Sequence, residues 1–261
     1  MTPFVELNDA VVRRKGNVIL DIDRFVLPEG QSVAVLGPNG AGKSTLIQLI
    51  TREILPLHRD VPPVVFRGNP RATLAQVKES TGVVSSTMQD QIDVQLPAIE
   101  VVCGGLFGAL GVPSHCIVSD ESLEAAHQAL ESVGIGGLAE RMMPTLSSGQ
   151  ARRVLIARAL IHDPDVLVFD EPTTALDPEG MYYVRKAMRD LYRLGKSIVL
   201  VTHYPEDIIP EIDRVVMIKD AHIFDDGPKE RMLTNSKMSQ LFNVPLRVLH
   251  EDSFYSIATE Y

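Results

Sequence analysis

Residues 32–45 read SVAVLGPNGAGKST, an apolar strand that leads directly into a glycine-rich loop and then a helix. The loop fits the pattern G-x-x-x-x-G-K-[ST] in the strand, loop and helix context that this pattern requires. Its glycines let consecutive backbone N–H groups close around phosphate oxygens, and the following helix directs its positive end at the same anion. The stretch therefore predicts a nucleotide-binding loop made of Gly37, Pro38, Asn39, Gly40, Ala41, Gly42, Lys43, Ser44 and Thr45.

Two side chains of this loop have distinct expected roles. The ammonium group of Lys43 would reach the β- and γ-phosphates, and the hydroxyl of Ser44 would be a ligand of Mg²⁺. A glycine-rich turn without any ligand is the alternative interpretation. It would leave the lysine without an evident partner, so we expect a bound phosphate.

Polar residues follow two other apolar strands. Asp170 and Glu171 come directly after the strand at 166–169, and His203 ends the strand at 197–202. Because α/β sheets bind ligands at the carboxyl ends of parallel strands, these residues are candidates for the same site. Asp170 suits the Mg²⁺ shell, and Glu171 is placed to take a proton from an attacking water. Taken alone, each is more simply a strand end or a structural histidine.

The pentapeptide LSSGQ, residues 146–150, opens a helix with little bulk and many donors. Ser147, Ser148 and Gly149 offer hydroxyl groups, backbone N–H groups and a favourable helix dipole to an anion. The segment is thus a candidate second phosphate-binding element. An ordinary serine N-cap on an amphipathic helix is the simpler explanation of these residues in isolation.

Hydrophobic periodicity predicts alternating strands and helices around an inserted helical region. The expected strands are 4–7, 18–22, 32–36, 64–66, 82–85, 166–170, 197–202 and 214–218. The expected helices are 43–54, 74–80, 99–110, 121–133 (with Ser119 or Asp120 as N-cap), 150–161 and 179–194. Several strands are apolar on both faces, as in a parallel sheet covered by helices. Residues 246–261 alternate and form a candidate β-hairpin.

Composition sets the outer limits. The chain has 261 residues, 45% hydrophobic and 23% charged, which is ordinary globular composition. The net charge of −9 disfavours a general attraction to nucleic acid or anionic lipid. Cys103 and Cys116 read as plain thiols. We see no leader at the start, and the longest apolar run, 101–113, is too short to cross a bilayer, so we expect a soluble cytoplasmic protein.

The motifs together resemble those of the ATP-binding cassette (ABC) ATPases. The loop 37–45 is similar to the Walker A loop, LSSGQ to the signature motif, VLVFDEP (166–172) to Walker B, ALD (175–177) to the D-loop, and Thr202-His203 to the switch histidine, all in the family's order. The resemblance covers about residues 4–242. It implies an α/β fold with a P-loop NTPase (RecA-like) core, an N-terminal antiparallel β subdomain and an inserted helical subdomain. We assign residues 1–245 to the ATPase domain, with a core of 1–87 and 162–245 and a helical subdomain at 88–161.

The same resemblance implies a mechanism that needs two cassettes. ATP bound by Lys43 of one cassette would meet the signature of the other, Ser147, Ser148, Gly149 and Gln150, in a homodimer or heterodimer. Asp177 would lie at the dimer seam. The implied cofactors are ATP and Mg²⁺, with catalytic roles for Lys43, Glu171 and His203.

Three departures from the family pattern affect individual residues. Ser148 stands where the signature usually has glycine, which restricts the backbone and puts basal activity in question. The aromatic residue expected to stack on adenine is missing, so we expect Arg13 or, by preference, Arg14 to stack there. A serine, Ser86, ends the strand where the Q-loop glutamine is usual. Gln89, or else Gln91, is the nearest substitute as Mg²⁺ ligand.

The preferred function is the ATPase subunit of an ABC transporter with separate membrane permease subunits, at the inner face of the cell membrane. Residues 99–112 lie where the family's helical subdomain receives that partner, although they could equally be a buried helix pair. A soluble ABC ATPase of DNA repair, translation or cofactor assembly is the alternative. Against it stand the acidic charge, the single cassette and the lack of long heptad arms. A small-molecule kinase would have no use for LSSGQ.

Overall fold

The computed structural model describes residues 2–85, 88 and 94–259. The chain divides into two compact units. The first contains Met1–Lys78 and Ser197–Tyr261, and the second contains Glu79–Lys196. The subdomain boundaries expected at residues 88, 161 and 245 stay predictions.

The first unit begins with the expected antiparallel sheet. Its strands are β1 (Val5–Arg14), β2 (Asn17–Leu27) and β4 (Val64–Phe66), in the order β2-β1-β4. Lys15 and Gly16 both have positive φ, 49° and 84°, which is the backbone of a two-residue hairpin turn between β1 and β2. The two strands stay paired up to this turn, with one shift of register between Val12 and Arg13, so they are longer than the apolar runs predicted.

Parallel strands form a second sheet region of this unit. It contains β7 (Ser197–Thr202), β3 (Val33–Leu36), β8 (Arg214–Lys219) and β9 (His222–Pro228), with β3 paired in parallel to both β7 and β8. All four residues of β3 are buried, as predicted for a central strand. The antiparallel edge strand β9 was missed, because its polar residues His222, Asp225 and Asp226 break the apolar pattern.

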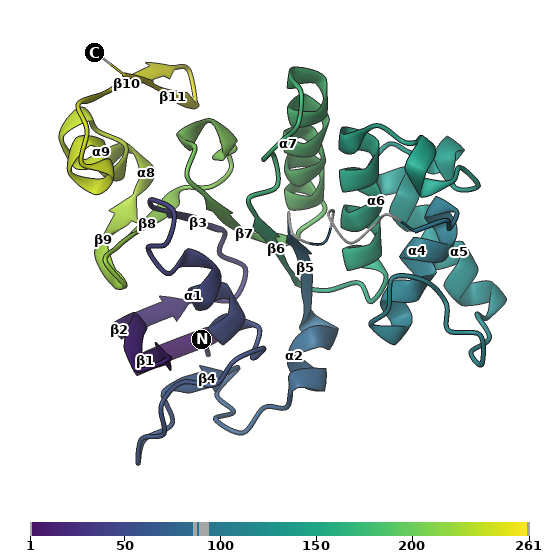
Figure 1. The fold of residues 1–261 in the computed structure, drawn as a ribbon, viewed down its shortest axis with the longest axis horizontal. Helices are drawn as coiled ribbons and strands as arrows, with labels where there is room; N and C mark the ends of the chain where they lie inside the picture. The colour runs from purple at the N-terminus through teal and green to yellow at the C-terminus, as the bar shows by residue number, and fades with distance from the viewer. Residues whose placement is uncertain (1, 86–87, 89–93, 260–261) are drawn as a thin grey trace. The chain divides into compact units, whose positions relative to one another are not determined.

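Three helices and a terminal hairpin complete the first unit. They are α1 (Lys43–Ile50), α8 (Lys229–Met232), α9 (Asn235–Phe242) and the strands β10 (Leu246–Glu251) and β11 (Phe254–Thr259), seen in yellow beside α9 in Figure 1. Helix α1 ends four residues before the predicted Ile54. The reason is local, since Arg52 has φ 57° and cannot continue a right-handed helix.

The second unit carries one parallel strand pair and most of the helices. Helix α2 (Leu74–Ser80) crosses the boundary into β5 (Thr81–Ser85), which pairs with β6 (Val166–Asp170). Helices α4 (Ala98–Gly104), α5 (Asp120–Ser132) and α6 (Ser148–Leu160) pack together, and α6 also packs on α7 (Pro178–Arg193) (Figure 1). Single 3₁₀ turns occur at Gly105–Phe107, Gly136–Leu138, Met143–Thr145 and, in the first unit, Pro205–Asp207.

The predicted helix at 99–110 is correct only in its first half. Helix α4 stops at Gly104, and Gly108 turns the chain with φ 65°. The returning chain then bonds back, with the Ala109 N–H donating to the Gly104 carbonyl at 2.9 Å. The cluster of glycines therefore ends a helix that apolar spacing alone would extend. No helix within the described residues is both long enough and apolar enough to cross a membrane.

Candidate nucleotide site

The phosphate loop is shaped by close packing around its glycines. A Cβ atom on Gly37 would lie 2.2 Å from the carbonyl oxygen of Ile218, and one on Gly42 would lie 2.9 Å from that of Ile19. Gly40 and Gly42 also have left-handed φ values of 78° and 108°. A larger residue would therefore lack space at Gly37 and Gly42, and it would have a strained backbone at Gly40 and Gly42.

Lys43 lies inside the loop that it follows. Its side chain is only 4% exposed, and Nζ donates to the carbonyl oxygens of Gly37 at 2.8 Å and Pro38 at 3.1 Å. The N-cap of α1 is Gly42, which provides no side-chain cap, and the first turn carries no acidic residue. The positive end of α1 is thus left to an external anion. Ser44 is exposed beside it.

The turn between β8 and β9 ties this loop to the N-terminal sheet. The Ala221 N–H donates to the Ala41 carbonyl at 3.2 Å, and the Ala221 carbonyl accepts from the Asp21 N–H at 2.7 Å. Strand β2 also meets the loop directly, through Ile19 and Leu20 against Gly42. Arg13 and Arg14 are exposed at the tip of the same β1–β2 hairpin.

His203 lies at the same sheet edge as the loop. Leu36 pairs with Thr202 in the parallel β3–β7 register, so Gly37 and His203 are the next residues of neighbouring strands. The following turn is held by Thr202, whose buried hydroxyl donates to Oδ2 of Asp207 at 2.8 Å and accepts from the Tyr204 N–H at 3.0 Å. The pair of Thr202 and Asp207 was not predicted from the sequence. The short polar run after the strand was the one available signal.

Asp170 and Glu171 lie at the end of β6 in the second unit. Asp170 pairs with Ser85 of β5, and Glu171 has a φ of 50°, which is uncommon for a residue with a side chain. Arg152, only 2% exposed, donates from Nη1 to the Glu171 carbonyl at 3.3 Å. The Thr174 hydroxyl donates to Oε2 of Glu171 at 3.4 Å. Arg152 therefore holds the backbone of Glu171 and Thr174 holds its carboxylate, and no motif indicated either residue.

The signature segment is a complete helix cap. The Gln150 N–H donates to the hydroxyl oxygen of Ser147 at 3.3 Å, and the Ser147 N–H donates to Oε1 of Gln150 at 3.0 Å, which together make a capping box on α6. The simpler interpretation of LSSGQ is thus correct in this structure. It does not exclude phosphate binding, because a hydroxyl that accepts one hydrogen bond still has its own proton to donate. Ser147 and Ser148 are exposed, and Gly149 is buried.

Asp177 caps the neighbouring helix. Its Oδ1 accepts from the Gly180 N–H at 2.8 Å at the start of α7, and the residue is exposed. The N-termini of α6 and α7 therefore both begin with an exposed polar cap. Gln89, Gln91 and Ser86 lie outside the described residues.

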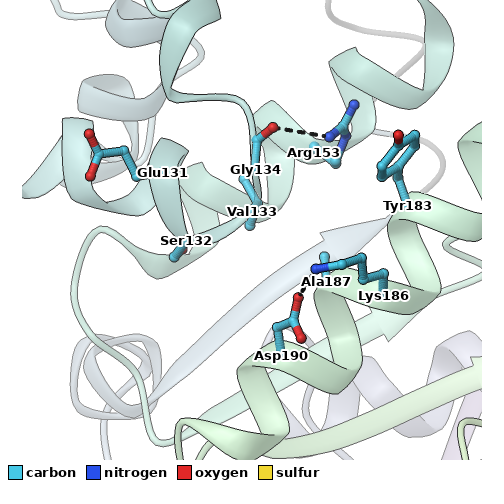
Figure 2. Close-up of a pocket in the computed structure, with 9 residues that line it drawn as sticks. All are labelled: Glu131, Ser132, Val133, Gly134, Arg153, Tyr183, Lys186, Ala187 and Asp190. Atoms are coloured by element: carbon cyan, nitrogen blue, oxygen red, sulfur yellow. Dashed lines mark hydrogen bonds and ion pairs between the residues drawn. The ribbon is translucent and has the colours of Figure 1, made fainter.

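A cavity of about 260 Å³ lies along the same two helices, against the end of α5 (Figure 2). Arg153 forms part of its wall, with the guanidinium 4.6 Å from the ring centre of Tyr183 and Nη1 donating to the Gly134 carbonyl at 3.3 Å. Burial lowers the pKa of Arg153, and the nearby Tyr183 and Glu179 oppose that shift. Lys186 on the opposite side pairs with Asp190 at 2.5 Å. None of the sequence motifs contributes a predicted site residue to the wall of this cavity.

Comparison with known proteins relates most of the chain to one family. The sequence model described as ABC transporter matches residues 20–174. The ABC transporter ATP-binding protein YlmA of Bacillus subtilis is 30% identical over 94% of this chain and 93% of its own length. The energy-coupling factor transporter ATP-binding protein EcfA of Methanocaldococcus jannaschii is 32% identical over 95% of this chain and 87% of its own.

A solved structure agrees with the sequence matches. The cbiO1 protein of Clostridium perfringens, part of the ABC transporter complex cbiONQ, superposes with a TM-score of 0.75 at 26% identity, over 92% of this chain and 94% of that one. The expected α/β fold with an antiparallel N-terminal sheet is thereby confirmed. Fold, motifs and relatives agree that this chain belongs to the ABC transporter family, as an ATP-binding subunit whose ATP hydrolysis is coupled to transport.

Proposed function

We propose that two copies of this chain bind two ATP molecules between them, each held by the phosphate loop of one copy and the signature helix of the other. The observation that supports this proposal is that the N-termini of α1 and α6 both offer hydrogen-bond donors to an external anion. The N-terminus of α1 has no side-chain cap, and Lys43, its first residue, is buried against the phosphate loop. Ser147, at the N-terminus of α6, is exposed and its hydroxyl still has a proton to donate. Each element is built to receive phosphate oxygens.

Hydrolysis then needs three side chains at the triphosphate. Lys43 exchanges its two loop carbonyls for the β- and γ-phosphates. Glu171 accepts the proton of the attacking water, and His203 contacts the γ-phosphate from the strand beside the loop. Asp177 of each copy faces the dimer seam, where it senses the neighbouring site.

Mg²⁺ is the proposed metal cofactor, and the donor chemistry fits it. Ser44 supplies an exposed hydroxyl and Asp170 a carboxylate, both hard oxygen donors. Within the described residues no group of three or more His, Cys, Asp or Glu side chains forms a protein-only metal site. Mg²⁺ usually combines one or two protein ligands with substrate phosphates, so it would bind here together with ATP and neutralise phosphate charge. Gln89 stays the proposed third ligand.

We assign adenine contact to Arg14. Its exposed guanidinium sits at the tip of the hairpin whose residues Ile19 and Leu20 pack against Gly42 of the phosphate loop. A planar guanidinium stacks on aromatic faces, including purines.

The proposed interaction with membrane subunits is based on the relatives. EcfA is a transporter ATP-binding protein and cbiO1 is part of a transporter complex, so we propose that this chain acts at the cytoplasmic face of the cell membrane on separate permease subunits. Every residue of helix α4 except Glu100 is buried, whereas Phe107, three residues after the helix ends, is 38% exposed. The permease contact therefore centres on residues 105–112.

The test is Glu171→Gln, which removes the base and keeps the shape of the side chain. With MgATP, we expect turnover to fall by about 10² to 10⁴-fold, the usual contribution of a general base, and the protein to accumulate as a dimer. Phosphate release and light scattering after size exclusion measure the two effects. Glu140→Gln, an exposed carboxylate of the same unit, is the matched control. A Glu171→Gln protein that binds ATP but stays monomeric would rule out the shared site between two copies.

A further inference from the structure

Helix α6, which begins at the signature, and helix α7, which follows the D-loop, contact each other through two glycines. A Cβ atom on Gly149 would lie 2.7 Å from the Cα of Gly180, and one on Gly180 would lie 3.3 Å from the Cα of Gly149. Both residues are buried, one in the first turn of α6 and the other in the first turn of α7. The backbones of the two helix N-termini are therefore in direct contact, which leaves no room for a side chain.

Gly180 also supports the cap of its own helix. Its N–H donates to Oδ1 of Asp177 at 2.8 Å, and a Cβ atom on Gly180 would lie 2.9 Å from that same oxygen. One residue thus fixes the Asp177 side chain and at the same time contacts Gly149, two positions from the cap of α6 at Ser147.

The contact continues one turn along both helices. Arg153 follows Gly149 by four residues and Tyr183 follows Gly180 by three, so each lies on the same helix face as its glycine. The guanidinium of Arg153 is 4.6 Å from the ring centre of Tyr183, as Figure 2 shows at the upper end of the cavity. Two successive contacts therefore set the register of α6 against α7.

We propose that Gly180 is a positioning residue for ATP hydrolysis. It holds Ser147 and Asp177 at a fixed separation, so that both side chains meet the second copy of the chain together. This inference rests on the shared nucleotide site proposed above. It assigns a role to a residue that belongs to none of the recognised motifs.

Gly180→Ala tests the inference with a single added methyl group. Alanine is the better helix residue, but its methyl group has to displace the Asp177 carboxylate and the Gly149 backbone slightly, so we expect only a small fall in the thermal unfolding temperature. Turnover should nevertheless fall by about tenfold to a hundredfold, since a misplacement of about 1 Å at a reacting centre costs up to about 10²-fold. The MgATP dissociation constant of the monomer should not change, because Lys43 and its loop belong to the other unit. Gly137→Ala is the matched control, with nothing within 4 Å of the added atom and an ordinary φ.

The same substitution in the Glu171→Gln background separates the two proposals. If Glu171→Gln dimerises with MgATP and the double variant dimerises at least tenfold more weakly, the positioning role is supported. If the double variant dimerises equally well, or if Gly180→Ala keeps wild-type turnover, the role of Gly180 is overturned and the shared site stands. If Glu171→Gln itself fails to dimerise, the shared site is wrong. Should Gly180→Ala not fold, Tyr183→Leu removes the second contact at a partly exposed position, and unchanged turnover would then overturn the inference.

Discussion

The phosphate loop and the signature helix are two halves of one proposed site, yet they are built in different ways. The loop is one contiguous segment, residues 37–45, and its own lysine closes it through the carbonyls of Gly37 and Pro38. The signature half depends on two helices distant in sequence, which meet at Gly149 and Gly180. In the first half the binding groups lie on one continuous stretch of backbone, and in the second they lie on two helices that pack against each other.

This difference predicts which measured property, nucleotide binding or turnover, a substitution in each half should change. Residues of the loop act directly on the nucleotide, so their loss should reduce binding by a single copy. Residues of the signature half act only when a second copy approaches, so their loss should reduce turnover and leave binding by the monomer intact.

Lys43→Ala should have the largest effect. Hydrogen bonds from a charged group contribute about 1.5 to 3 kcal/mol each, so losing the ammonium should weaken MgATP binding by about 10- to 150-fold. Loss of a transition-state donor adds about 10² to 10³-fold in turnover. We therefore expect kcat/KM to fall by more than about 10³-fold. Isothermal titration calorimetry and phosphate release measure the two parts.

Lys78→Ala is the control for that experiment, because Lys78 is an exposed lysine of the same unit. Wild-type affinity together with wild-type turnover in Lys43→Ala would contradict the assignment of the loop. A drop in turnover with unchanged affinity would instead mean that Lys43 acts only in the transition state.

The same division explains what could be predicted from sequence. The loop, the Asp170-Glu171 pair and the strands around them are contiguous patterns, so spacing and apolar runs identify them directly. Ser119 is the N-cap of α5, one of the two residues expected there. Three supporting residues could not be predicted in this way: Gly180, Arg152 and Thr174. None of them belongs to a recognised motif, and their roles come from contacts that only the folded structure shows.

Errors in the predicted elements have a related cause. Apolar spacing extended α4 to Leu110, although Gly104 and Gly108 redirect the chain, and polar residues concealed β9. In both cases the deciding interaction is with another segment: the Ala109 N–H bonding back to Gly104, and β8 pairing with β9. Periodicity reports burial of a face and carries no information on such partners.

Ser147→Ala should have the second-largest effect, and the effect should be on turnover. The substitution removes the hydroxyl that accepts from the Gln150 N–H and, by our proposal, donates to the γ-phosphate of the other copy. We expect turnover to fall by about 10²-fold and MgATP binding by the monomer to stay within about twofold. Loss of the cap should also lower the free energy of unfolding by about 1 kcal/mol.

A second serine cap separates these two losses. Ser119 caps α5 in the same way, accepting from the Ser122 N–H at 3.2 Å, and it lies outside every nucleotide motif. Ser119→Ala should lower stability by a similar amount and keep full turnover. If both variants lose turnover equally, the effect of Ser147 is structural and the signature helix does not read the phosphate.

Gly37→Ala should have the smallest effect, on the stability of the loop half. The added Cβ would lie 2.2 Å from the Ile218 carbonyl, so β3 and β8 must shift apart where the loop begins. Overpacking of this kind costs about 1 to 3 kcal/mol in the free energy of unfolding, which denaturant titration measures against the same substitution at Gly137. Because the loop is held by these strands, MgATP affinity should weaken in parallel. Full stability in Gly37→Ala would mean that the loop and β8 move apart to accept the added methyl group at no cost, and the contrast between a rigid loop and an assembled signature half would be lost.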